Sequence, residues 1–289
     1  MAVVSSGGPL AARRKLGNAL RVLRDQHALT AEEVGGHLDC HLTKISRLEL
    51  GKRACTQRDF DALMDLYDVG DEQRQELQAL MIRGRQRVAP WWDAYSDVIT
   101  ASYAEFLTYE AEAAACLEYQ PLAIPALFQT ESYARAISGP GFTPLGPDQV
   151  DSLVEVKLRR QERLREEHPL AIEAVVTEAA LRSQAGSVEV MREQLRALRN
   201  VSSLPHASLR VIPFEALGNG GATGAFTLFG AGGGKDADVA FMESVERTTF
   251  RDDAITLRRL NRLHKNLAEA ALSKEGSLEL VERIEKETR

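Results

Sequence analysis

Residues 30–53 read TAEEVGGHLDCHLTKISRLELGKR, and this stretch decides how the first part of the chain folds. Thr30 is a residue that favours a helix N-cap, and Glu33 stands three positions later, where a capping box requires it. Asp39 follows where the chain has to reverse in the left-handed region, which Asp tolerates better than most residues. The pattern predicts a short helix, a tight turn and a second helix.

The second helix of this pair has one apolar face and one outward face. Its stripe contains Ile45 and Leu48, three residues apart. Two capped helices joined by a tight turn are the layout of a helix-turn-helix, whose second helix enters the major groove of DNA. The same stretch also fits a plain amphipathic hairpin in a helical protein. The residues expected to contact DNA are Thr30, His41, Leu42, Thr43, Lys44, Arg47, Lys52 and Arg53.

The distribution of charge favours DNA binding over the hairpin alternative. Residues 11–58 hold ten Lys or Arg against five Asp or Glu, whereas the whole chain has a net charge of -6. A locally basic segment on an acidic protein suits phosphate contact without indiscriminate binding of nucleic acid. One recognition helix reads only a few base pairs, so we expect a homodimer on a pseudo-palindromic operator of double-stranded DNA. Candidate phosphate contacts, each of which also fits an ordinary solvated charge, are Arg13, Arg14, Lys15, Lys52, Arg53 and Arg58.

The segment TKISRLELGKR, at residues 43–53, resembles the recognition helix of the Cro/repressor-type (XRE) regulators. In that family an Arg near the end of the first helix pairs with the Glu after the recognition helix, and Arg24 and Glu49 occupy these places. The resemblance therefore implies a structural ion pair between them. The chain departs from the family pattern with His41 where a capping Ser or Thr is usual and with Asp39 in place of Gly.

The bulk composition is that of an ordinary folded protein with room for two domains. The chain has 289 residues, of which 44% are hydrophobic and 27% charged. No apolar run approaches the ~20 residues that span a bilayer. Its three scattered cysteines suit neither a disulfide framework nor a zinc site. These features predict a cytoplasmic protein that has no membrane association, no metal and no cofactor.

The order of patterns implies a mainly α N-terminal helix-turn-helix bundle plus an α+β C-terminal domain with a mixed or antiparallel sheet. The expected divisions are a DNA-binding domain at 10–70, a linker helix at 71–91, a regulatory domain at 92–272, and a mobile or partner-seeking helical tail at 273–289. In the regulatory domain, strands are expected at 114–119, 171–177, 208–214, 225–229 and 238–243, and helices at 95–109, 148–167, 187–199 and 251–271.

Several stretches of the second domain carry a further resemblance. They include EYQPLAIPALFQTESYARA at 118–136, RRQERL at 159–164, TEAALR at 177–182 and LRVIPF at 209–214. These resemble the C-terminal domain of unknown function found behind XRE heads in actinobacterial regulators, WhiJ-like proteins among them. The resemblance implies an antitoxin-like transcription regulator that responds to a small acidic partner protein encoded next to it.

A small-molecule signal stays open beside the partner protein. Regulatory α+β domains behind DNA-binding heads commonly bind effectors in an apolar cleft with few polar groups. The two hypotheses are therefore a repressor regulated by a partner protein and a regulator that senses an effector. The aromatic residues that fit such a pocket, and that fit an ordinary core equally well, are Tyr103, Phe106, Tyr109, Tyr119, Phe128 and Tyr133.

The motifs do not support catalysis. The stretch GNGGATG at 218–224 precedes a strand, whereas a dinucleotide site needs a helix, and GAGGGKD at 230–236 lacks the Ser or Thr of a phosphate loop. The six His show no paired metal spacing. Glu110, Glu112 and Glu178 fit the lining of a pocket, but acidic residues at strand and helix ends are more often solvated or salt-bridged. We therefore expect a protein that is not an enzyme.

Overall fold

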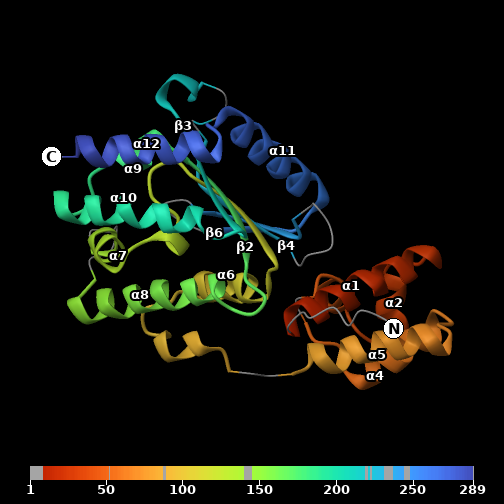
Figure 1. The fold of residues 1–289 in the computed structure, drawn as a ribbon. Coiled ribbons are helices and arrows are strands. Elements are labelled where there is room, and N and C mark those ends of the chain that lie inside the picture. The colour runs from red at the N-terminus through yellow and green to blue at the C-terminus, as the bar shows by residue number, and fades with distance from the viewer. Residues whose placement is uncertain are drawn as a thin grey trace. The chain divides into compact units, whose positions relative to one another are not determined.

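The computed structural model describes residues 9–51, 53–86, 89–139, 145–218, 221, 223–230, 237–243 and 248–288. The chain divides into two compact units, residues 1–90, called the head below, and residues 91–289, called the second unit. Figure 1 shows their elements. Lys52 and most of the two glycine-rich stretches lie outside the described residues, so the predictions made for them are not addressed by the structure.

The described part of the head is helical. Its core gathers buried side chains from every helix, among them Leu20, Val34, Ile45, Phe60 and Met81. Thr30 and Thr56 begin two of the helices, because each side chain accepts a hydrogen bond from a backbone N–H of the first turn. The helices are α1 (Pro9–Gln26), α2 (Ala31–His37), α3 (Leu42–Glu49), α4 (Gln57–Leu66) and α5 (Asp71–Gly84).

Helix α5 belongs to the core of the head and is not a separate linker. Leu77 and Met81 are 5% and 1% exposed and lie in the same hydrophobic cluster as Leu20 of α1. The narrow apolar stripe of this charged helix is the side that packs on the bundle, and its other sides face water. The division expected at residues 70 and 71 is therefore wrong, because burial of this stripe ties α5 to the bundle.

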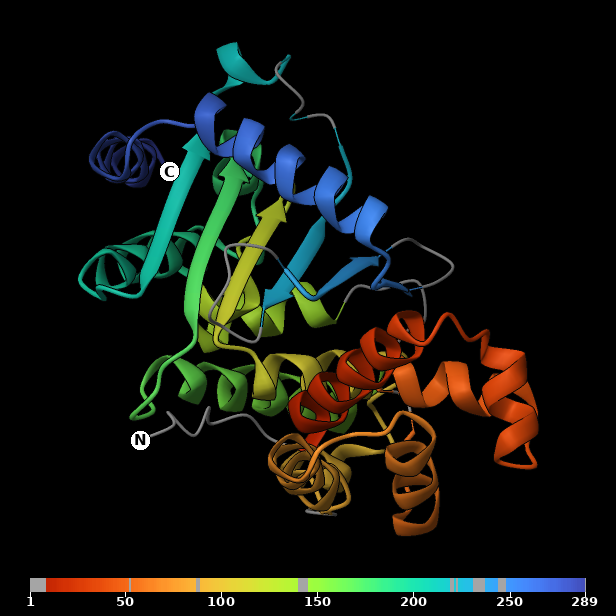
Figure 2. The same cartoon turned by 90° about the vertical axis from the view of Figure 1, so that its right-hand side faces the viewer.

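The second unit is built on a six-stranded mixed sheet in the order β3-β2-β1-β4-β5-β6. Strands β1, β2 and β3 are parallel, while β4, β5 and β6 continue the sheet in antiparallel fashion (Figure 2). The predicted α+β class is confirmed. The strands are β1 (Ala115–Gln120), β2 (Ala171–Thr177), β3 (Ala207–Ile212), β4 (Phe226–Gly230), β5 (Val239–Glu243) and β6 (Thr248–Arg251), the last of which the sequence patterns did not predict.

The helices of the second unit begin where capping residues stand. The helix expected at 95–109 starts later, because the Thr100 side chain accepts a hydrogen bond from the backbone N–H of Tyr103. The helix expected at 148–167 ends as a 3-10 turn after Arg160. The helical segments are η1 (Trp91–Tyr95), α6 (Ala101–Glu112), η2 (Ala126–Phe128), α7 (Glu131–Ser138), α8 (Pro147–Arg160), η3 (Gln161–Leu164), α9 (Glu178–Arg182), α10 (Val188–Ser202), η4 (Phe214–Ala216), α11 (Ala254–Ala270) and α12 (Lys274–Glu287).

Helices cover both faces of the sheet. Helix α11 runs across one face, where Leu257 and Leu267 pack in a cluster with Tyr119 of β1 (Figure 2). On the other face, Phe106 of α6 lies 4.5 Å from Phe241 of β5, measured between ring centroids. Alternation along each strand sends successive side chains to these two different layers. Polar side chains on the α6 face of the sheet contribute to a candidate site of the second unit.

Helix α12 is a packed element and not a mobile tail. Its Leu280, Val281 and Ile284 are buried, and it lies beside α10 and β3. An ion pair of 2.7 Å joins Arg196 of α10 to Glu285 of α12. The prediction of a mobile tail at residues 273–289 is wrong, because the apolar side of this short helix completes the core over α10 and β3.

Candidate functional site

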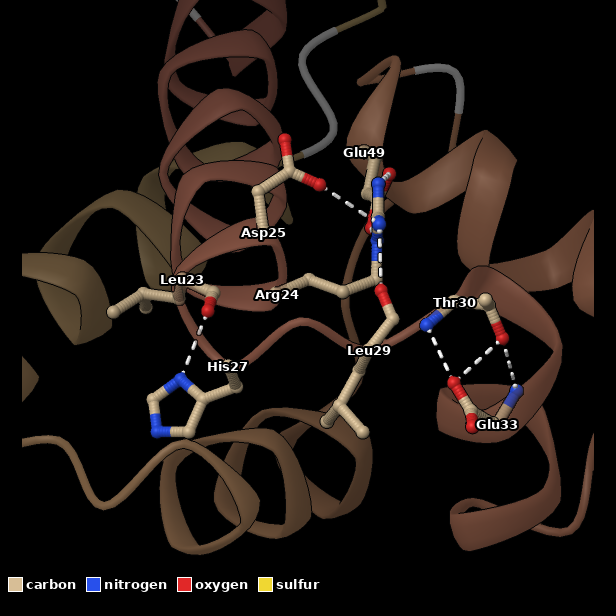
Figure 3. A network of polar contacts seen from close by, with 8 residues as sticks. All are labelled: Leu23, Arg24, Asp25, His27, Leu29, Thr30, Glu33 and Glu49. Atoms are coloured by element: carbon tan, nitrogen blue, oxygen red, sulfur yellow. Dashed lines mark hydrogen bonds and ion pairs between the residues drawn. The ribbon is translucent and has the colours of Figure 1, made fainter.

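The N-terminus of α2 is fixed by a capping box between Thr30 and Glu33. The Glu33 backbone N–H donates to Thr30 Oγ1 at 3.2 Å, and the Thr30 backbone N–H donates to Glu33 Oε2 at 2.7 Å (Figure 3). The backbone N–H and the hydroxyl of Thr30 both donate to the Glu33 carboxylate and lower its pKa. Both residues are exposed, but the polar groups of Thr30 already have partners in the cap. The structure therefore places Thr30 as the residue that starts the helix.

The turn between α2 and α3 uses the two residues that depart from the family pattern. Asp39 has a φ of 50°, which is the left-handed conformation expected for the reversal. His41 acts as the N-cap of α3, since its Nδ1 accepts a hydrogen bond from the Thr43 backbone N–H at 3.2 Å. An imidazole nitrogen thus replaces the usual hydroxyl oxygen as the acceptor, and the helix starts at the position that the sequence predicted.

Helix α3 presents a small exposed surface around Arg47. Leu42 is 42% exposed, and Thr43 and Arg47 are also exposed, whereas Ile45 and Leu48 of the same helix are buried in the core. The side chain of Arg47 has no hydrogen bond or ion pair to any residue that the structure describes. Its five N–H donors are therefore available to an acceptor outside the head. Arg53, two residues beyond the helix-ending Gly51, is exposed as well.

Lys44 does not point outward, which corrects the prediction that it contacts base edges. Its Nζ lies 2.7 Å from Asp59 Oδ1 on α4, and the side chain of Lys44 is 23% exposed. Burial tends to raise the pKa of Asp59, but hydrogen bonds from Lys44 and Thr56 outweigh it and lower that pKa. Helical periodicity places Lys44 on the outer face of α3, but its side chain bends toward α4 and pairs with the nearly buried carboxylate of Asp59. Arg47 is then the only exposed basic side chain of α3.

An ion pair between Arg24 and Glu49 joins the end of α1 to the end of α3. Arg24 Nε and Nη2 donate to the two carboxylate oxygens of Glu49 at 2.6 and 3.0 Å, and Nη1 donates to the Leu29 carbonyl oxygen at 2.9 Å (Figure 3). The side chains are 14% and 9% exposed. The structure thus brings together the two residues that the family resemblance paired. This contact sets the position of the recognition helix relative to α1.

The helices can approach this closely because position 17 is a glycine. A Cβ atom at Gly17 would clash with the backbone carbonyl oxygens of Leu48 and Glu49. Arg13 and Arg14 lie inside α1, which begins at Pro9, and both are half-buried, so they do not form the exposed basic segment expected before the first helix. The sequence analysis missed the role of Gly17, because nothing local in α1 requires a glycine.

A cavity of about 450 Å³ lies in the second unit between the sheet and helices α6 and α8. Glu118 of β1, Thr227 of β4 and Phe241 of β5 are neighbours across the strands and form its floor. The cavity falls within the size range of ligand pockets, which is roughly 300–1,000 Å³. Other lining residues are Val98, Thr100, Tyr103, Phe106, Gln120, Ala123, Ile124, Ala126, Gln129, Ser138, Leu153, Lys157, Arg160, Ala225, Phe226 and Glu243.

Only two of the six aromatic residues expected at an effector pocket line this cavity. Tyr103 and Phe106 do so. The other four, Tyr109, Tyr119, Phe128 and Tyr133, are buried and are not among the described residues that line it. Two of them show why: Tyr119 packs on the α11 side of the sheet, and the Tyr133 hydroxyl accepts a hydrogen bond from the Ile124 backbone N–H. Residue type alone could not distinguish these surroundings.

A buried ion pair closes one end of the cavity. Arg160 Nε and Nη2 donate to the two carboxylate oxygens of Glu110, each at 2.7 Å, and Nη1 donates to the Tyr103 hydroxyl at 3.1 Å. The two charged side chains are 7% and 3% exposed. The Arg160 guanidinium also lies over the Phe106 ring, 4.9 Å from its centroid. The donors of Arg160 are thus largely used within the protein.

Three further charged groups, those of Glu118, Lys157 and Glu243, line the cavity without an ion-pair partner in the described part of the chain. The pKa of Glu118 is raised to about 7, mainly by burial and also by the charges of Glu110 and Glu243, against the hydrogen bond from Gln120 and the positive charge of Arg160. Burial and the positive charge of Arg160 lower the pKa of Lys157 to about 8. The sequence contains a signal for the burial of Glu118. This residue lies inside strand β1, two positions after the buried Cys116, and residues two apart in a strand point to the same face of the sheet.

Comparison with protein families assigns both units. A family model described as Helix-turn-helix domain matches residues 15–77, which extend into the first half of α5. A second model, described as Domain of unknown function (DUF5753), matches residues 103–283, more than half of the chain. The chain belongs to the DUF5753 family. The DUF5753 match reaches into α12, which agrees with the packing of that helix. Searches of curated proteins and of solved structures found no match.

Among the described residues, no His, Cys, Asp and Glu side chains form a group of three or more suited to a metal ion. No described helix combines the length and apolar character needed to cross a membrane. Of the glutamates considered as pocket residues, Glu110 pairs with Arg160, and Glu178 pairs with Arg182 at 2.6 Å. The exposed surface of α3 around Arg47 and the cavity of this DUF5753 unit are the two candidate sites.

The ion pair between Arg24 and Glu49 should show strong coupling in a double-mutant cycle. Arg24→Ala or Glu49→Ala leaves one charge poorly solvated at the α1–α3 junction. We expect a coupling free energy of about 1–3 kcal/mol in the thermal or urea unfolding of a fragment covering residues 1–90. The exposed pair Arg74 and Asp65 is the control and should couple by less than about 1 kcal/mol. Equal coupling in the two cycles would contradict the structural role of Arg24.

Glu118→Gln should remove part of the pH dependence of stability in the second unit. Between the unfolded pKa near ~4.3 and the folded pKa of about 7, the folded state keeps a proton that the unfolded state has lost. Stability therefore falls as pH rises through this window. Between pH ~5 and pH ~8, the free energy of unfolding of the variant should rise by about 1–3 kcal/mol relative to that of wild type.

Urea titrations at several pH values, followed by the fluorescence of Trp91 and Trp92, measure this difference, because both tryptophans of the chain lie in the second unit. The exposed Glu193→Gln on α10 is the matched control and should leave the pH slope unchanged. A slope shared by wild type and Glu118→Gln would show that Glu118 ionises as it does in water.

Proposed function

We propose that this protein is a sequence-specific DNA-binding transcription regulator of the XRE class, with α3 as its recognition helix. The observation that carries the proposal is the exposed face of α3, on which Arg47 stands without a partner among the described residues. An arginine at such a place can form a bidentate pair with guanine O6 and N7 in the major groove. The helix-turn-helix match and the basic segment around it support the same conclusion.

Roles within the head divide between base contacts and phosphate contacts. Leu42 and Thr43 stand beside Arg47 at the exposed start and middle of α3, where an apolar contact with a thymine methyl group is within reach. Arg53 and Lys52 follow the helix and suit the phosphate backbone, and the backbone N–H groups of the first helical turns, next to Thr30 and His41, suit it as well. Two chains would read two half-sites about one DNA turn apart, so we propose a homodimer on a pseudo-palindromic operator.

The second unit, in this proposal, receives a signal and performs no chemistry. The resemblance to antitoxin-like regulators supports a small acidic partner protein as the signal and repression as the output. A specific observation favours a second candidate, a small-molecule effector, because the cavity beside Glu118 has the size of a ligand pocket and is lined by both apolar and polar side chains. Either ligand changes the affinity for DNA only to the extent that it binds the DNA-binding conformation of the protein more tightly or more weakly than its other conformation.

Arg47→Ala should abolish operator preference while the head stays folded. Loss of a bidentate base contact costs roughly 1–3 kcal/mol on operator DNA and much less on random DNA. Arg53→Ala should weaken binding to both DNAs about equally and reduce the salt dependence of binding. Fluorescence anisotropy with operator and scrambled duplexes at several salt concentrations measures both effects.

The exposed Arg21→Ala on α1, away from α3, serves as the control substitution. Identical losses for Arg47→Ala and Arg53→Ala on both DNAs would overturn the division of roles. The mass of the operator complex in solution should correspond to two chains per duplex, and a complex with one chain would overturn the dimer.

Deletion of the second unit should separate DNA binding from regulation. A fragment of residues 1–90 keeps the recognition helix and its own core, so it should still prefer operator DNA, with weaker binding if the second unit contributes to the dimer. The small acidic protein encoded beside this chain should change the operator affinity of the full chain and leave that of the fragment unchanged. An equal response from both proteins would place the signal in the head.

A further inference from the structure

Three polar groups around the cavity of the second unit have bonding capacity left over. Glu118 accepts one hydrogen bond, from Gln120 Nε2 at 3.0 Å, although a carboxylate can accept several. Lys157 Nζ donates to the Ser138 hydroxyl at 2.8 Å and has two more donors. Gln129 is 6% exposed, and its Oε1 has no hydrogen-bond partner in the described part of the chain.

The charges of opposite sign in this cavity do not neutralise each other. No ion pair links Lys157 or Glu118 to an oppositely charged residue among those described, whereas the neighbouring Arg160 is fully paired with Glu110. Both groups sense the charge of Glu243 at the end of β5. A buried charge without a partner is costly, and proteins usually pair it or remove it. In this cavity, the amine of Lys157 and the carboxyl group of Glu118 both border the open volume and have no ionic partner among the described residues.

The walls between these groups are apolar. Val98, Ile124, Leu153 and Phe241 line the same cavity, and alternation of the strands places Phe241 in line with Thr227 and Glu118. A ligand that fits must therefore present an apolar body together with charged ends. A ligand with two positive ends would be repelled by Lys157, and a ligand with two negative ends would be repelled by Glu118 and Glu243.

We propose that this cavity binds a zwitterionic small molecule, whose ammonium group pairs with Glu118 and whose carboxylate pairs with Lys157 across an apolar spacer. Each end then forms a charge-assisted hydrogen bond with a group that otherwise lacks an ionic partner. The amine has a further acceptor available at Gln129 Oε1. This inference rests on the effector-sensing candidate of the proposed function and specifies the chemistry of the effector.

A homologous series of ω-amino carboxylates, from γ-aminobutyrate to ω-aminododecanoate, tests the proposal. The full chain is titrated with each compound in a calorimeter, and the α,ω-diamine and dicarboxylate of the same chain length are the controls. One member of the series should bind, and both controls of that length should bind about tenfold more weakly or worse. Failure of every amino carboxylate to bind, or equal binding of a control, would overturn the proposal.

Two variants assign the ends of the ligand. Glu118→Gln should weaken binding of the zwitterion about tenfold, and the zwitterion should then bind no more tightly than the dicarboxylate. Lys157→Met should make the zwitterion bind no more tightly than the diamine. The exposed Glu193→Gln and Lys265→Met are matched controls that should bind like wild type. A general loss of folding would weaken all three ligand classes together, so the crossed pattern is specific to the proposed pairs.

Binding is measured without DNA, so its outcome is independent of the proposed function. If the zwitterion binds as expected but operator affinity does not change, the ligand site stands and the effector role fails. If Arg47→Ala leaves operator recognition intact, the DNA-binding proposal fails while the cavity chemistry is unaffected. Unchanged zwitterion affinity in both Glu118→Gln and Lys157→Met would overturn the site itself.

Discussion

A guanidinium group cannot be buried at low cost without a carboxylate, and the partner of Arg160 comes from a different helix. The bidentate pair with Glu110 fixes α8 against α6, and the Tyr103 hydroxyl and the Phe106 ring take up the remaining faces of the guanidinium. Because α6 also packs on the sheet through Phe106, this one contact sets the distance between sheet and helices. The cavity occupies the space that this arrangement leaves beside β1 and β5.

The far wall of the cavity is held by side chains that bond to backbone. Gln194 of α10 donates to the Phe128 carbonyl oxygen and accepts from the Thr130 N–H, and Gln161 donates to the carbonyl oxygens of Ala126 and Gln129. Backbone groups in an irregular segment have no sheet or helix partner, so these amides satisfy them. The segment after β1 is thereby fixed in place, and a ligand in the cavity would meet a wall that is already ordered.

The head solves a different problem, which is to hold the exposed face of α3 in a fixed direction relative to the other helices. Gly17 lets the carbonyl end of α3 come close to α1, and Arg24 then locks the two helices through Glu49. Lys44 is held by Asp59, so the positive charge that remains exposed on α3 is that of Arg47. Specificity in such a head depends on few contacts, which makes their orientation more important than their number.

Local chemistry was sufficient to predict most of the strands and helices of this protein, although not strand β6. The capping box at Thr30, the left-handed Asp39 and the alternating apolar strands determine where helices, turn and sheet occur, because each acts over a few residues. The family resemblance paired Arg24 with Glu49, which no local pattern could do. Only the tertiary structure decided that Lys44 turns inward and that α5 and α12 are packed core elements. It also decided that Glu118 and Lys157 border one cavity, since burial and partners depend on elements far apart in the chain, which periodicity cannot place.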